Sequence, residues 1–83
     1  PNPFNPVTNL SYEIIKDSFI SIKIMDIRGR HIVTLINGYH SKGNHIIQWD
    51  GTNSRGVQQT SGIYLYTIEN ENYSRTGKMI YLK

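Results

Sequence analysis

The residues that could do chemistry in this chain are few, and their spacing is the first guide to function. Asp50–Gly56 comes nearest to a ligand loop, because Asp and Asn oxygens alternate with glycine as in a calcium site. It lacks acidic residues at the third and fifth positions and a distal Glu, so turn chemistry explains it better. The three histidines, His31, His40 and His45, show no metal-ligand spacing on a predictable common surface. We therefore expect no metal site and no cofactor.

A catalytic constellation is also missing from the sequence. No serine lies in a Gly-x-Ser-x-Gly elbow, and the six carboxylates are dispersed over separate segments. Each glycine is isolated, so there is no glycine-rich loop to hold a phosphate. The chain has no cysteine, which excludes thiol chemistry and Cys-based zinc sites. The sequence predicts that this protein is not an enzyme.

The aromatic residues are the other candidates for ligand binding. Trp49 could stack on a sugar, but a single Trp in an alternating strand more often lies in the core of a sandwich. Tyr64 stands near the start of a late strand. This position is typical of a corner tyrosine, whose hydroxyl bonds back to the backbone. Both residues are therefore expected to be structural.

Composition narrows the class of partner. At 83 residues the chain is one small domain, and its net charge of +3 comes from dispersed bases. The longest basic run is Arg28-Gly29-Arg30, which is too short for the basic face that nucleic acid requires. No apolar run reaches the length of a membrane span, and no signal peptide is present. We expect no nucleic acid partner and no stable membrane insertion.

Short alternating segments separated by turn residues indicate the elements that must position these side chains. We expect seven strands, over residues 8–15, 20–24, 31–36, 44–49, 57–59, 63–69 and 73–82. Strands of this length at intervals of roughly ten residues favour an all-β, immunoglobulin-like antiparallel β-sandwich of the constant type. The residues expected in the core share a parity within their strands: Tyr12, Ile22, Ile24, Leu35, Ile47, Trp49 and Tyr64.

Turn signals add finer expectations. Asn37-Gly38 is the strongest short turn signal in the chain. The run over 31–36 alternates in two conflicting phases, which predicts a β-bulge. At least two of Gly29, Gly38 and Gly62 should have a positive φ, because hairpin and bulge geometry favours residues without a Cβ.

Several motifs occur together in a family order. They are Pro1-Asn-Pro-Phe-Asn-Pro6, Ile24-Met-Asp with Gly29-Arg30, Gly43-Asn-His with Trp49-Asp50-Gly51, Ser61-Gly62-Ile-Tyr64-Leu-Tyr66, and Lys78-Met79-Ile80-Tyr81-Leu82-Lys83. Together they resemble the C-terminal sorting domain of proteins exported by the type IX (Por) secretion system. They are equally similar to the immunoglobulin-like domain of the flagellar hook-capping protein. The chain departs from the pattern at Ile15-Lys16, where Leu-Pro is common, and at Lys42, where Ala is common.

The first resemblance implies a non-catalytic module that directs a passenger through the type IX system. Its expected partners are an N-terminal passenger, outer-membrane secretion machinery and a sortase-like protease, with a route through the periplasm to the cell surface or medium. Residues 1–7 would be a Pro-rich junction and residues 8–83 the sorting domain. The chain begins with Pro1 and not Met, which fits a piece of a longer protein.

The final segment is the expected recognition site within that family. An edge strand offers free backbone groups to a partner strand, so we expect the translocon to read Lys78, Met79, Ile80, Tyr81, Leu82 and Lys83. Protection of the edge against aggregation explains the two lysines equally well. The remaining motif residues are expected to be structural: Gly29, Arg30, Trp49, Asp50, Gly51, Gly62 and Tyr64.

Two other functions stay open from the sequence. One is a carbohydrate-binding or spacer module of a surface enzyme, which would need Trp49 and at least two tyrosines exposed and coplanar. The other is a structural domain of the flagellar cap, which would assemble with copies of itself.

Overall fold

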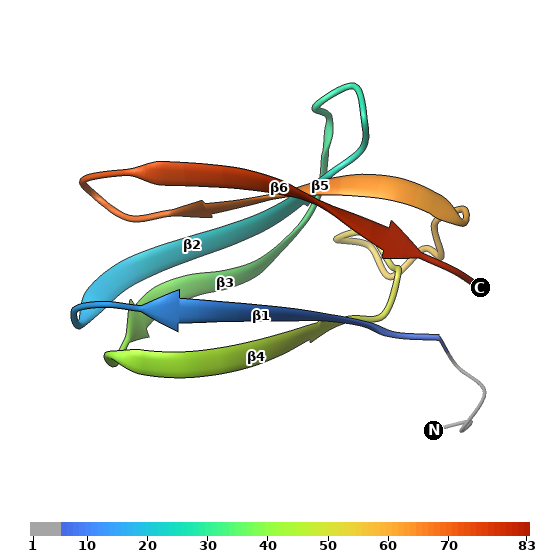
Figure 1. The fold of residues 1–83 in the computed structure, drawn as a ribbon. Helices are drawn as coiled ribbons and strands as arrows, with labels where there is room; N and C mark the ends of the chain where they lie inside the picture. The colour runs from blue at the N-terminus through green and yellow to red at the C-terminus, as the bar shows by residue number, and fades with distance from the viewer. Residues whose placement is uncertain (1–5) are drawn as a thin grey trace.

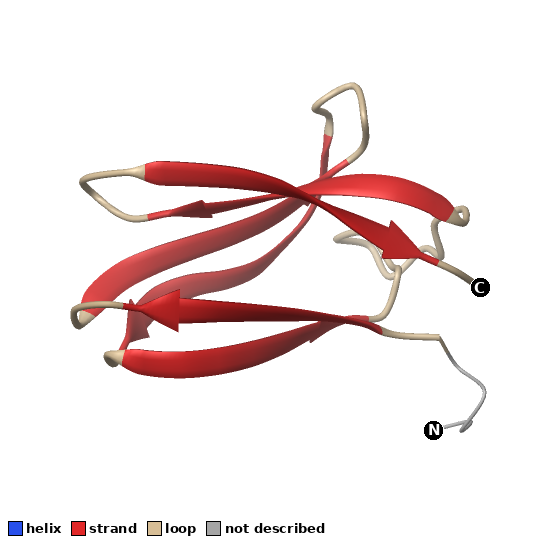
Figure 2. Ribbon diagram, in the orientation of Figure 1, coloured by secondary structure: helices blue, strands red, loops and turns tan. Residues whose placement is uncertain are grey.

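The computed structural model describes residues 6–83, and in that range it contains strands and turns but no helix (Figure 2). Six strands follow one another: β1 (Thr8–Ile14), β2 (Ser18–Met25), β3 (His31–His40), β4 (Gly43–Trp49), β5 (Gly62–Glu69) and β6 (Ser74–Tyr81). Most of the expected junction over residues 1–7 lies outside the described residues.

The strands form two antiparallel sheets that face each other (Figure 1). One sheet has two strands in the order β1-β4, and the other has four in the order β3-β2-β5-β6. This arrangement confirms the predicted immunoglobulin-like sandwich. The expected seventh strand over 57–59 is reduced to an isolated bridge between Thr52 and Gln58. Its loop is closed locally instead, since the Gln59 N–H donates to the Gly51 carbonyl at 2.7 Å.

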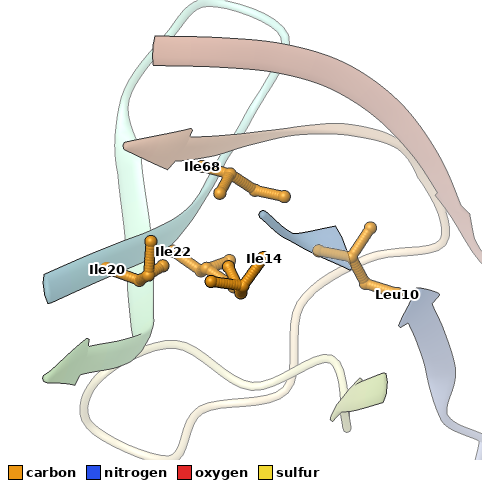
Figure 3. Packing of buried hydrophobic residues seen from close by; sticks show 5 residues of the cluster. All are labelled: Leu10, Ile14, Ile20, Ile22 and Ile68. Atoms are coloured by element: carbon orange, nitrogen blue, oxygen red, sulfur yellow. The ribbon is translucent and has the colours of Figure 1, made fainter. Parts of the chain in front are cut away.

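A first cluster of aliphatic side chains fills one part of the interior. It consists of Leu10 and Ile14 from β1, Ile20 and Ile22 from β2, and Ile68 from β5 (Figure 3). The two residues on β1 are four apart and the two on β2 are two apart, so alternation places each pair on one face, the inner one. The sequence parity that predicted a buried face on β1 and β2 is confirmed here.

A second cluster is mainly aromatic. It contains Ile24, Trp49, Tyr64, Met79 and Tyr81, and Trp49 and Tyr81 are among its most deeply buried members. Of the expected core, Ile22, Ile24, Trp49 and Tyr64 are buried. Tyr12, Leu35 and Ile47 are only half-buried against the clusters. The last three lie on β1, β3 and β4, which are edge strands and so remain open to solvent on one side.

The β3 strand departs most from the sequence prediction. Asn37 and Gly38 do not turn but pair with Ser21 and Ile20 of β2, and the chain turns after His40. Long-range pairing has therefore overridden a local turn signal. The register shifts twice along β3, which leaves Leu35 and Ile32 as extra residues, and this confirms the expected bulge.

The glycine prediction is also confirmed. Gly29 has a φ of +82° and Gly62 a φ of +156°, whereas Gly38 lies in ordinary strand geometry. Gly29 closes the turn between β2 and β3, where its N–H donates to the Asp26 carbonyl at 2.9 Å. That turn requires a residue that tolerates positive φ.

Candidate functional site

The outer edge of β6 is the candidate recognition site. Among the described strands, β6 pairs with β5 on one side only. On its other side the Thr8 hydroxyl donates to the Ile80 carbonyl at 3.0 Å, so the backbone of Ile80 points away from β5. Backbone direction alternates along an antiparallel strand, which turns the N–H and C=O groups of Thr76 and Lys78 outward as well. At Thr76 and Lys78 this edge therefore presents backbone groups that can pair with a further strand.

The six residues expected to be recognised divide between the interior and the surface. Met79 and Tyr81 point into the core and are 7% and 0% exposed. Lys78, Ile80, Leu82 and Lys83 are exposed, with Ile80 at 60% and Leu82 at 68%. Only these four can contact a partner through their side chains.

Apolar side chains on the outer face of the sheet extend this edge. Ile63 lies directly opposite Ile80 on β5 and is 51% exposed. Ile63, Lys78, Met79 and Ile80 line a shallow hollow, and a second hollow on the other side of Ile63 reaches Ile27. The edge thus combines backbone donors and acceptors, an apolar hollow and basic side chains.

The aromatic motif residues Trp49 and Tyr64 are buried in the core. The ring centroids of Trp49 and Tyr64 are 4.8 Å apart, and those of Trp49 and Tyr81 are 5.1 Å apart. The indole Nε1 of Trp49 donates to the Thr52 carbonyl at 2.9 Å. The hydroxyl of Tyr64 donates to the Thr60 carbonyl at 2.6 Å, which confirms the corner tyrosine. A buried Trp49 also removes the aromatic platform that carbohydrate binding would need.

The Asp50–Gly56 loop is built by turn chemistry, as predicted. The Asp50 carboxylate accepts from the hydroxyl and the N–H of Thr52 at 2.6 Å and 3.0 Å. These bonds hold the pKa of Asp50 below its ordinary value, with the hydroxyl as the largest cause. Burial, with the nearby charge of Asp50, raises the pKa of Tyr81. The Tyr81 ring lies over Gly51, where a Cβ would overlap it.

The Gly29-Arg30 motif lies in a second turn that a carboxylate closes. The Asp26 carboxylate accepts from the N–H groups of Arg28 and Arg30 at 2.9 Å each, and from Arg30 Nε at 2.7 Å. The backbone bond from Arg30 is the largest cause that lowers the pKa of Asp26. These contacts close the turn after β2.

Sequence reasoning missed one grouping of side chains. The rings of His40 and His45 are 5.0 Å apart, and Tyr12 stacks on His45 at 5.4 Å. The expectation that the histidines share no surface is wrong for this pair, although His31 lies apart and contacts Thr34. The signal was the short span from 40 to 45 across a turn. The sequence does not predict this contact, because the Asn37-Gly38 signal places the turn before His40.

Residues 6–83 contain no cluster of three or more His, Cys, Asp or Glu side chains suited to a metal ion. Those residues also form no helix with the length and apolar character to cross a membrane.

Comparison with known proteins identifies relatives of this chain. A family model described as the FlgD Ig-like domain matches residues 11–74. Among solved structures, FlgD from P. aeruginosa is 19% identical with a TM-score of 0.73, over 92% of this chain and 59% of that one. FlgD from Xanthomonas campestris is 19% identical with a TM-score of 0.70, over 93% of this chain and 56% of that one. The chain thus spans under three fifths of either relative. A search of curated proteins gave no match.

These matches correct the functional expectation. The matching family model and the similar structures belong to FlgD and not to a type IX sorting domain, so the sorting function is wrong. The outer-membrane secretion machinery and the sortase-like protease are withdrawn as partners for the same reason. The expected route through the periplasm to the cell surface or medium is withdrawn with them. The motifs shared by the two families had not distinguished one from the other.

Proposed function

This chain belongs to the FlgD Ig-like domain family, and from that membership we propose that it is a non-catalytic structural domain of a flagellar hook-capping protein. The observation that carries the proposal is the family match over residues 11–74, which spans all of β2 to β5 and most of β1. The Xanthomonas relative is described as giving insights into the hook capping essential for flagellar assembly. The folded unit would be residues 8–83, joined through residues 1–7 to the rest of its parent.

The use of the polar side chains supports a non-catalytic role. Asp26 and Asp50 are both engaged in closing turns. The hydroxyl of Tyr64 is bonded to the backbone, and Trp49 is buried. The pKa values of Asp26 and Asp50 are lowered, and the hydrogen bonds that close their turns explain this lowering.

The domain would attach to its neighbours in the cap through the outer edge of β6. The outward backbone of Thr76 and Lys78 can extend the sheet by one strand. Ile80 and Leu82 would bury apolar surface on contact, and Lys78 would pair with an acidic side chain of the neighbour. The same lysine in an unassembled chain discourages non-specific pairing.

The proposal is tested by replacing the Ig-like domain of a resident FlgD with residues 8–83. We expect cells with this chimera to build hooks and swim, whereas an unrelated immunoglobulin-like sandwich at the same position should not support either. Chimeric protein that accumulates in folded form without hooks would refute the proposal. Equal rescue by the unrelated sandwich would reduce the domain to a spacer and would also refute it.

A further inference from the structure

Two imidazole rings meet where β3 passes into β4. His40 is the last residue of β3 and His45 is the third residue of β4, so one ring comes from each sheet. Their centroids are 5.0 Å apart with an angle of 75° between the ring planes. Both residues are half-buried, so the pair remains accessible to small solutes.

The His45 ring is held in place before any ligand binds. Its Nε2 lies 2.8 Å from the Ser41 carbonyl oxygen, which can only accept, so Nε2 carries the proton. The neutral ring then has its lone pair on Nδ1. Tyr12 stacks on the same ring at 5.4 Å and 17°. A ligating histidine usually donates its other nitrogen to a carbonyl or carboxylate in this way, which fixes its tautomer and orientation.

The separation of the two rings also suits coordination. With metal–nitrogen distances of about 2.0–2.1 Å, two imidazoles on one tetrahedral ion have centroids about 5 Å apart. The observed separation of 5.0 Å matches this value. The distance between the rings is therefore compatible with both histidines binding one ion.

We propose that His40 and His45 form a two-imidazole site for a late first-row divalent ion such as Zn²⁺. Nitrogen ligands favour Zn²⁺, Cu²⁺ or Ni²⁺ over Mg²⁺ or Ca²⁺. With two protein ligands, water completes the coordination, and the ion exchanges readily. Glu13 and Arg75 line the hollow beside His45, and Asp17 holds the Lys42 N–H at the adjacent turn. The bound ion would tie the end of one sheet to the other.

The site is tested by titrating the 83-residue chain with Zn²⁺ in a calorimeter. We expect one ion per chain, and at least about tenfold weaker binding in His40→Gln and in His45→Gln. His31→Gln is the matched control, because His31 contacts Thr34 and lies apart from the pair. Its affinity should equal that of the wild type.

Nuclear magnetic resonance of the wild-type chain gives a second test that does not depend on the folding of any variant. On addition of Zn²⁺, the ring nitrogen resonances of His40 and His45 should shift together while those of His31 stay in place. Unchanged affinity in either variant, an equal loss in His31→Gln, or shifts that do not single out this pair would each overturn the proposal.

Discussion

Three buried aromatic side chains connect the two sheets at one end of the sandwich. Trp49 comes from β4 of the two-stranded sheet, whereas Tyr64 and Tyr81 come from β5 and β6 of the other. Each has its polar atom bonded: Trp49 to Thr52, Tyr64 to Thr60, and Tyr81 to Gln58. Satisfied polar atoms allow these large rings to be buried without an unpaired donor.

Truncation of the largest of these rings should be severe. Trp49→Ala removes a side chain that is 1% exposed, and we expect a loss of about 3–5 kcal/mol in the free energy of unfolding. Ile15→Ala is the control, because Ile15 is 77% exposed and its loss should change stability by less than about 0.5 kcal/mol. Urea unfolding followed by circular dichroism measures both. Similar losses in the two variants would contradict the assigned core.

Two glycines allow the stability cost of steric overlap to be measured apart from the cost of a left-handed backbone. Gly51 and Gly56 have nearly equal φ values of +82° and +79°. A Cβ on Gly51 would overlap the Tyr81 ring, whereas a Cβ on Gly56 has no described atom within 4 Å. Gly56→Ala should cost about 1–2 kcal/mol from the left-handed backbone alone. Gly51→Ala should cost clearly more by the same unfolding measurement, and equal costs would disprove the close packing.

Acid should weaken the fold through Asp50. Its pKa in the folded chain is below the ordinary value of 3.8, because Thr52 donates to the ionised carboxylate. A depressed folded pKa gives stability that is complete above 3.8 and is lost as the pH falls through the folded pKa. Asp50→Asn keeps the acceptor oxygen but cannot titrate. Between about pH 5 and about pH 2.5 the variant should therefore lose less stability than the wild type. An identical pH dependence would show that Asp50 contributes nothing.

At the scale of strands, the period of two was enough to predict most of the fold. Alternation placed Ile22, Ile24 and Trp49 correctly in the core, because each strand buries one face. It could not show that Asn37-Gly38 would pair with β2, since that pairing depends on residues distant in sequence. The two conflicting patterns of alternation over residues 31–36 did indicate the irregular pairing of β3.

The same limitation applies to the candidate sites. The final strand could be recognised as an edge from its place in the family order, but its outward carbonyl at Ile80 required the contact from Thr8. The pairing of His40 with His45 depends on a crossing between sheets. A periodic pattern within one strand carries no information on such a crossing.

Proline substitutions test which backbone groups of β6 face outward. The Lys78 N–H points away from β5, whereas the Arg75 N–H points toward it by alternation. Both side chains are basic and exposed, so the two variants form a matched pair. Arg75→Pro removes a ladder hydrogen bond and should destabilise the chain by at least about 1 kcal/mol more than Lys78→Pro. A larger loss of stability in Lys78→Pro than in Arg75→Pro would show that the inward and outward N–H groups of β6 are wrongly assigned.

At the scale of the whole molecule, the edge at β6 combines unpaired backbone groups with exposed apolar and basic side chains. The central strands β2 and β5 are each paired on both sides, and they supply the rigid body of the domain. The β6 edge and the exposed Ile63 and Ile80 lie together on that body. In the proposed cap domain, this body would hold the β6 surface in a fixed orientation.

Site-specific crosslinking in growing hooks tests the β6 edge most directly. The chain has no cysteine, so Lys78→Cys in the chimeric cap introduces the one thiol of this domain. We expect this thiol to crosslink to a neighbouring subunit in assembled hooks. Arg55→Cys is the control, because Arg55 is exposed in the Asp50–Gly56 loop. We expect no crosslink from a thiol at this position. Crosslinks from position 55 but not from position 78, in cells that build normal hooks, would contradict assembly through β6.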